Sequence, residues 1–108
     1  MNILLLGSGG REHALAWRMA RSPRLRELYI APGNPGMAPY GTCFPEVGVT
    51  DFPAIAELIT KLNINLLVVG PEVPLVEGLV DYLRAKKGMH DLLIVGPDAK
   101  GAQIEGSK

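Results

Sequence analysis

The sequence predicts a doubly wound α/β fold: a mainly parallel sheet of about five strands, in the order 3-2-1-4-5, with helices on both faces. Three short runs made only of apolar residues dominate the chain, at 3–6, 66–69 and 92–95. None of them alternates polar with apolar residues, which is typical of central parallel strands buried on both faces. Helical patterns separate the runs, and strands that alternate with helices indicate βαβ units with right-handed crossovers.

Two further strands are expected at 28–31 and 47–49, the second with the shorter apolar pattern. Helices are expected at 11–21, 52–62 and 75–86. In the last two segments apolar residues recur at the i, i+3, i+4, i+7 spacing that gives a helix one buried face. The five strands and three helices together account for most of the chain.

Single residues sharpen these expectations. Thr50 or Asp51 precedes the second helix and has a side chain suited to an N-cap. We expect Leu58 to lie in the core below that helix, and Trp17 to be a core residue of the first helix. A further helix is expected to begin at 99–105.

Composition narrows the classes of function. The chain has 108 residues, and its 11 lysine plus arginine residues balance 11 aspartate plus glutamate residues. A nucleic-acid or anionic-membrane partner normally requires a basic excess, so neither is expected. The single cysteine, Cys43, excludes an internal disulfide bond and fits a reducing compartment. No stretch has the pattern of a signal peptide or the length of a membrane span, so we expect a cytoplasmic protein.

Gly7, Gly9 and Gly10 form the most informative motif, a glycine turn between the first strand and the first helix. Such a turn collects unpaired backbone N–H groups at the positive end of the helix dipole, which is a ready site for a phosphate or carboxylate. Arg11 adds a cation that suits a phosphate. The alternative is a turn that serves only the close packing of helix on sheet. Three glycines within four residues exceed what packing requires, so anion binding is favoured.

The turn resembles the dinucleotide fingerprint G-x-G-x-x-G but lacks two of its features. Glu12 stands where the third glycine is required. The second strand also ends without the carboxylate that would hold a ribose hydroxyl, since its acidic residue, Glu27, lies at its beginning. Binding of NAD or FAD is therefore disfavoured.

Three further side chains are candidates for ligand contact, and each has a structural alternative. Glu12 lies in the first helical turn, where a carboxylate also stabilises the helix dipole without touching a ligand. His13 serves equally well as a packing residue. Glu72 follows the fourth strand, near the point where the strand order reverses, and is expected to face the glycine turn across the crevice. There it would accept hydrogen bonds from sugar hydroxyls or an amine, unless it only caps the helix that follows.

Residues 32–46 show no periodicity and are rich in proline and glycine. A loop of this length is usually functional or mobile, and we expect it to lie over the same sheet edge as the glycine turn. Neither a metal-ligand spacing nor a nucleophile motif occurs in the sequence, so no metal ligand and no catalytic residue is predicted.

Six segments resemble, in order and spacing, the start of the phosphoribosylamine–glycine ligases, also called glycinamide ribonucleotide synthetases. They are Gly7-Ser8-Gly9-Gly10-Arg11-Glu12-His13-Ala14-Leu15, Ala31-Pro32-Gly33-Asn34, Val69-Gly70-Pro71-Glu72, Pro74-Leu75-Val76, Gly96-Pro97 and Glu105-Gly106-Ser107-Lys108. One segment alone would be weak, but six in register across the whole chain are specific.

The resemblance implies a Rossmann-like pre-ATP-grasp domain at 1–104, followed at 105–108 by the start of a linker into an ATP-grasp domain that is absent here. It implies a full-length enzyme of purine biosynthesis, which joins glycine to 5-phosphoribosylamine with ATP to give glycinamide ribonucleotide, ADP and phosphate. ATP and Mg or Mn would be held by the missing ATP-grasp and C-terminal domains. We therefore expect this fragment to bind neither of them and to be inactive alone.

In related formyl-transferring ligases the matching glycine loop and strand-end carboxylate hold the phosphate and ribose of a ribonucleotide, which by position implies Gly10, Arg11 and Glu72 here. The residues expected to bind the phosphoribosyl group of 5-phosphoribosylamine or glycinamide ribonucleotide are Gly9, Gly10, Arg11, Glu12, His13, Asn34 and Glu72. Two alternatives remain: a free-standing α/β module that binds a nucleotide or sugar phosphate, and a docking domain with an empty turn.

Overall fold

The structure, a computed structural model of the chain, describes residues 1–96. The helix expected at 99–105 and the domain boundary expected between residues 104 and 105 lie outside the described residues.

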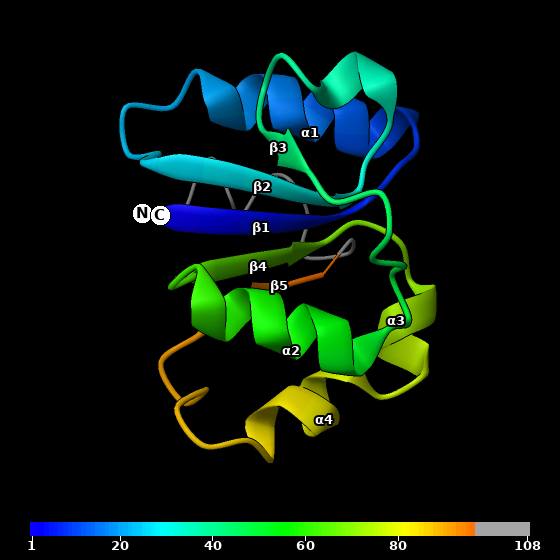
Figure 1. Cartoon of the computed structure of the whole chain (residues 1–108), viewed down its shortest axis with the longest axis vertical. Coiled ribbons are helices and arrows are strands. Elements are labelled where there is room, and N and C mark those ends of the chain that lie inside the picture. The colour runs from blue at the N-terminus through cyan, green and yellow to red at the C-terminus, as the bar shows by residue number, and fades with distance from the viewer. Residues whose placement is uncertain (97–108) are drawn as a thin grey trace.

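In the described part of the chain, five parallel strands form a sheet in the order β3-β2-β1-β4-β5 (Figure 1). The strands are β1 (Asn2–Gly7), β2 (Glu27–Pro32), β3 (Thr42–Cys43), β4 (Leu66–Val69) and β5 (Leu93–Val95). The helices are α1 (Gly10–Ala20), α2 (Phe52–Lys61), α3 (Val73–Val76) and α4 (Leu79–Arg84), with a short 3-10 helix, η1, at Pro35–Met37. The predicted order 3-2-1-4-5 is confirmed.

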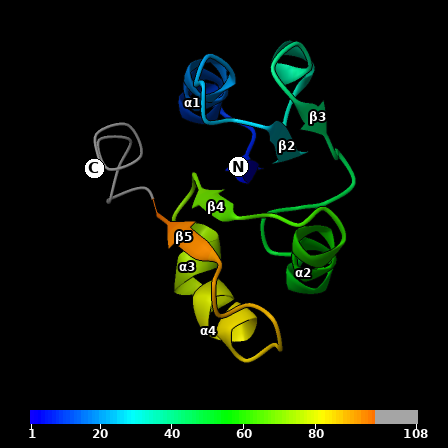
Figure 2. The same cartoon turned by 90° about the vertical axis from the view of Figure 1, so that its left-hand side faces the viewer.

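Successive side chains of β1 point to opposite faces of the sheet and pack in two separate hydrophobic cores, one on each face. Ile3 and Leu5 belong to the core beneath α1 and η1. Leu4 and Leu6 point to the opposite face, into the core beneath α2 and α4. Figure 2 shows α1 on one side of the sheet and α2 and α4 on the other. Because both faces are covered, the central strands consist of apolar residues without alternation.

Helix α2 begins where the sequence indicates. Asp51 is its N-cap residue, and its Oδ1 atom accepts a hydrogen bond from the Ala54 N–H at 3.4 Å. Leu58 is 8% exposed and belongs to the core on the α2 and α4 side of the sheet. The core position expected for Leu58 is therefore confirmed.

Trp17 is not a core residue, so that expectation was wrong. Its side chain is 47% exposed, and the Arg21 guanidinium lies over the indole ring at 4.7 Å. The buried residues of α1 are Glu12, Ala16 and Met19, which form a narrow stripe along one side. Trp17 follows Ala16 directly and is rotated about 100° away from this stripe.

The single helix expected at 75–86 is interrupted. Gly78 has a φ of 98°, which a right-handed helix does not accommodate, and it separates α3 from α4. Leu79 and Leu83 remain fully buried on the sheet, as their spacing indicates, but Val76 is 82% exposed. Pro74 of α3 is also fully buried and Leu75 packs against the core, so the break exposes only the far side of α3.

The third strand lies at Thr42–Cys43 and not at 47–49 as expected. β3 pairs with β2, and the Phe44 N–H extends this pairing by donating to the Ile30 carbonyl oxygen at 2.8 Å. The chain then turns, since the Val47 N–H donates back to the Phe44 carbonyl oxygen at 3.0 Å. The side chain of Val47 is buried in the core from this turn, so burial without strand pairing explains the apolar pattern at 47–49.

The segment 32–46 also differs from the irregular loop that the sequence suggests. It contains both η1 and β3, and Met37 of η1 is fully buried against the α1 side of the sheet. It starts at the carboxyl end of β2, which is paired with the carboxyl end of β1. The expectation that it lies at the edge of the glycine turn is confirmed.

Candidate functional site

The carboxyl ends of β1 and β4 define the point where the strand order reverses. The two strands pair from Ile3 with Leu66 to Leu6 with Val69, and the Gly70 N–H donates to the Leu6 carbonyl oxygen at 3.0 Å. The chain leaves β1 towards α1 on one face and leaves β4 towards α3 on the other (Figure 1). In doubly wound sheets such a switch point is the usual place for a ligand.

The glycine turn lies at this edge and leaves backbone donors free. Gly9 is the N-cap residue of α1, and its carbonyl oxygen accepts the first helical hydrogen bond, from the His13 N–H at 2.9 Å. Among the described residues, none accepts a hydrogen bond from the backbone N–H groups of Gly10, Arg11 or Glu12. These donors stand at the positive end of the helix dipole, so the turn can bind an anion.

Glu12 is turned towards the sheet and is only 7% exposed. Its Oε1 atom accepts a hydrogen bond from the Gly9 N–H at 2.9 Å, which is half of a capping box. Its side chain fills the space beside Gly7 and Gly70, where a Cβ atom on either glycine would overlap the Glu12 side chain. One amide of the turn is therefore satisfied from within the protein.

Asn34 ties the segment after β2 to the glycine turn. Its Nδ2 atom donates to the Ser8 carbonyl oxygen at 2.8 Å, and its Oδ1 atom accepts from the Gly36 N–H at 2.8 Å. The Gly33 N–H adds a backbone bond to the Gly7 carbonyl oxygen at 3.0 Å. An amide nitrogen carries two protons, so Asn34 keeps one donor for a ligand.

His13 packs against the same segment. Its ring lies 5.7 Å from the Tyr40 ring, centroid to centroid, at an interplanar angle of 59°. A Cβ atom on Gly36 would approach its Cε1 atom to 2.9 Å, so the imidazole also covers η1. The packing role foreseen for His13 is present, and its half-buried ring lies one turn from Gly9.

Arg11 and Glu72 are exposed, and no described residue pairs with either side chain. Glu72 occupies the N-cap position of α3, but its carboxylate caps nothing; only its carbonyl oxygen accepts, from Leu75 and Val76. The helix-capping alternative for the Glu72 side chain is thus not what the structure shows. It lies two residues beyond Gly70, on the segment that leaves the carboxyl end of β4.

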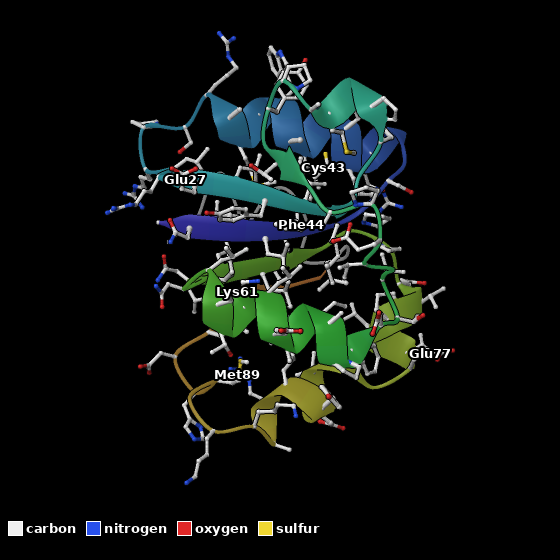
Figure 3. The ribbon with its side chains drawn as sticks, viewed as in Figure 1. Glu27, Cys43, Phe44, Lys61, Glu77 and Met89 are labelled. Atoms are coloured by element: carbon white, nitrogen blue, oxygen red, sulfur yellow. The ribbon has the colours of Figure 1, made fainter. Side chains whose placement is uncertain are left out.

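The two ends of the sheet differ in what they carry. Figure 3 shows Glu27 at the end of β2 remote from the loop that carries Glu77, which follows α3. Glu27 pairs in register with Asn2, at the start of β1, and so lies away from the glycine turn. A second-strand carboxylate for a dinucleotide ribose is absent from the carboxyl end of β2, as expected.

Sequence reasoning missed the packing partners inside the site. It did not foresee that Gly70 makes room for Glu12, or that the Ser8 carbonyl oxygen receives the Asn34 amide. The only available sign was that a glycine directly follows each of the runs 3–6 and 66–69. Within residues 1–96, no cluster of three or more His, Cys, Asp or Glu side chains is arranged to hold a metal ion. In the same residues, no helix has the length and apolar character needed to cross a membrane.

The fold and the site define a class: doubly wound α/β domains that offer free helix N-terminal amides at the strand switch point, the arrangement that binds phosphate-bearing ligands.

Comparison with known proteins identifies the family. Residues 1–105 match the family described as "Phosphoribosylglycinamide synthetase, N domain", and the chain belongs to this family. It is 49% identical over 108 residues to the phosphoribosylamine–glycine ligase of Mesorhizobium japonicum, and 48% identical over 109 residues to that of Escherichia coli strain K12. The crystal structure of the Thermotoga maritima phosphoribosylamine–glycine ligase has a TM-score of 0.51, with 34% identity, over 75% of this chain and 18% of that chain.

The resemblance stated from the sequence is thereby confirmed. Each of the two curated relatives matches the whole of this chain, but the chain spans only 24% of the length of each. The activity of the complete relatives is therefore carried to this chain only as a proposal.

Proposed function

We propose that this chain is the phosphoribosyl-binding N-terminal domain of a phosphoribosylamine–glycine ligase. The whole enzyme would join glycine to 5-phosphoribosylamine at the expense of ATP, giving glycinamide ribonucleotide, ADP and phosphate, in the cytoplasm. This chain alone would bind the phosphoribosyl substrate or product and would be inactive. The observation that carries the proposal is the set of free amides at Gly10, Arg11 and Glu12, in a chain of this family.

The proposed binding mode divides the ligand between the two sides of the crevice. The phosphate would accept hydrogen bonds from the free amides at the start of α1, and the Arg11 guanidinium would add a charge-assisted bond. Glu72, exposed and free of any capping role, would accept hydrogen bonds from ribose hydroxyls. Gly9, Glu12, His13 and Asn34 complete the proposed site by shaping the turn and the segment that covers it.

ATP with Mg or Mn would supply the activation of the glycine carboxylate in the whole enzyme. The described residues do not fit this role, because they contain no group of side chains arranged for a metal ion. Following the family resemblance, we place the nucleotide, the metal and the catalytic groups in the part of the longer relatives that this chain does not cover, and we assign no step of the reaction to this chain. The domains of that part would be its partners.

Calorimetric titration of this chain tests the proposal. Glycinamide ribonucleotide is the stable product, and ribose 5-phosphate and NAD serve as the comparison ligands. We expect the ribonucleotide to bind and NAD to give no heat. Binding of NAD, or of none of the three at millimolar concentration, would contradict the proposal. Equal affinity for ribose 5-phosphate and the ribonucleotide would favour a general sugar-phosphate module instead.

A further inference from the structure

Among the described residues, Glu12 is the charged residue that is buried, with an exposed fraction of 7%. Its neighbour Arg11 is exposed. A buried carboxylate is costly unless hydrogen bonds compensate for lost water. The Gly9 N–H at 2.9 Å from Oε1 supplies one such bond. A carboxylate held in this way has a defined place in the fold.

The place it holds lies between two strand ends. Cβ atoms built on Gly7 and on Gly70 would both overlap the Glu12 side chain, although Gly7 ends β1 and Gly70 directly follows β4. Gly7 has a φ of 138° and needs glycine on conformational grounds as well. Gly70 does not have a positive φ, so the Glu12 side chain is what requires a glycine there.

We propose that Glu12 is a positioning residue of the phosphoribosyl site: it contacts no ligand atom, and it acts by holding the Gly9 amide and by filling the gap between the ends of β1 and β4. This inference rests on the proposed function for its ligand. Two features set it apart from a contact role. The Oε1 atom is already engaged by Gly9, and a negative charge beside a bound phosphate would weaken binding.

Two substitutions separate positioning from contact. Glu12→Gln keeps the volume and an oxygen that accepts from Gly9, but removes the charge. Glu12→Ala removes the acceptor and the filling. We expect Glu12→Gln to bind glycinamide ribonucleotide within about threefold of the unmodified chain, and Glu12→Ala to bind at least about tenfold more weakly, because the turn loses its internal bond. If both substitutions weaken ribonucleotide binding equally, the carboxylate contacts the ligand. If Glu12→Ala binds with unchanged affinity, Glu12 does not position the site. Either result overturns the inference.

Hydrogen exchange gives a readout that does not depend on ligand. We expect the Gly9 amide to exchange faster in Glu12→Ala and at an unchanged rate in Glu12→Gln. Urea unfolding adds a coupling test, in which Gly70→Ala lowers the unfolding midpoint of the unmodified chain but has a smaller effect in a Glu12→Ala background. Gly48→Ala is the matched control, since nothing lies within 4 Å of its Cβ position and its φ is not positive.

The two proposals fail in different ways. If the unmodified chain binds no ribonucleotide, the proposed function fails, and the exchange and unfolding measurements still decide whether Glu12 holds the turn. If the chain binds but Gly70→Ala has the same effect in both backgrounds and Gly9 exchange does not change in Glu12→Ala, the positioning role is wrong while the proposed function stands.

Discussion

Replacing Arg11 by alanine is the most direct perturbation of the proposed phosphate contact. Arg11 is exposed, and no described residue pairs with its guanidinium, so its removal should leave the free energy of unfolding within about 0.5 kcal/mol of the unmodified value. Hydrogen bonds to charged groups are worth roughly 1.5–3 kcal/mol, and exposure puts this one at the lower end. A loss of about 1.5 kcal/mol raises the Kd for glycinamide ribonucleotide about tenfold.

Arg26→Ala is the matched control. It makes the same change in net charge, but at the amino end of the strands, opposite to the glycine turn. Arg26 is exposed and directly precedes β2, and its backbone N–H donates to the Met1 carbonyl oxygen at 2.7 Å. Calorimetric titration of both variants at low and at moderate salt is the assay. We expect the control to change the Kd by less than about twofold at moderate salt, because its charge is screened from the site. An equal loss in both variants, or no loss in Arg11→Ala, would refute a phosphate contact at this residue.

Three further predictions concern the turn, the crevice and the core. Gly10→Val should abolish ribonucleotide binding with the fold retained, since nothing lies within 4 Å of the Gly10 Cβ position; circular dichroism and calorimetry check this, and a variant that still binds would contradict it. Glu72→Ala should also abolish ribonucleotide binding while the unfolding midpoint stays unchanged, because its carboxylate caps nothing in the fold; unaltered affinity would remove Glu72 from the site. Leu58→Ala should lower the free energy of unfolding by about 2–5 kcal/mol, because Leu58 is buried beneath α2. The exposed Glu57→Ala is its control in urea unfolding, and equal midpoints for the two variants would show that Leu58 is not in the core.

Burial on both sides is why β1 and β4 could be predicted. The runs 3–6 and 66–69 are apolar throughout because α1 covers one face and α2 and α4 cover the other, and both runs fall within observed strands. The run at 92–95 was expected to be a central strand as well, but β5 is an edge strand and its Leu93 is 57% exposed. The edge strand β3 has two residues, of which Thr42 is exposed, so it leaves almost no pattern to detect. Val47 has the apolar character of a strand residue for a different reason, since it is buried from a turn.

The helices also show that periodicity predicts a buried face but not where a helix is interrupted. The spacing of Leu79 and Leu83 correctly marks a buried face, but periodicity does not register the left-handed conformation of Gly78 that ends α3. Trp17 was expected in the core, but its angular position beside the stripe that contains Ala16 puts it on the surface.

Within the site, the sequence predicts the free backbone N–H groups but not the contacts between residues that are distant in the chain. The free amides at the start of α1 follow from the glycine turn and the helix behind it, both of which are local features. The place of the Glu12 side chain depends on Gly70, which is distant in sequence and becomes adjacent only when β4 pairs with β1. Local reasoning therefore offered Glu12 a role at the helix dipole or in ligand contact, and did not reach its contact with Gly70 after β4.

An amide NMR titration of the unmodified chain with glycinamide ribonucleotide tests the central claim most directly, with NAD and ATP as control ligands. We expect chemical-shift changes centred on Gly9, Gly10, Arg11 and Glu72 with the ribonucleotide and no comparable changes with either control. Changes with NAD alone, or no changes with the ribonucleotide, would contradict a phosphoribosyl site formed by this chain at the ends of β1 and β4.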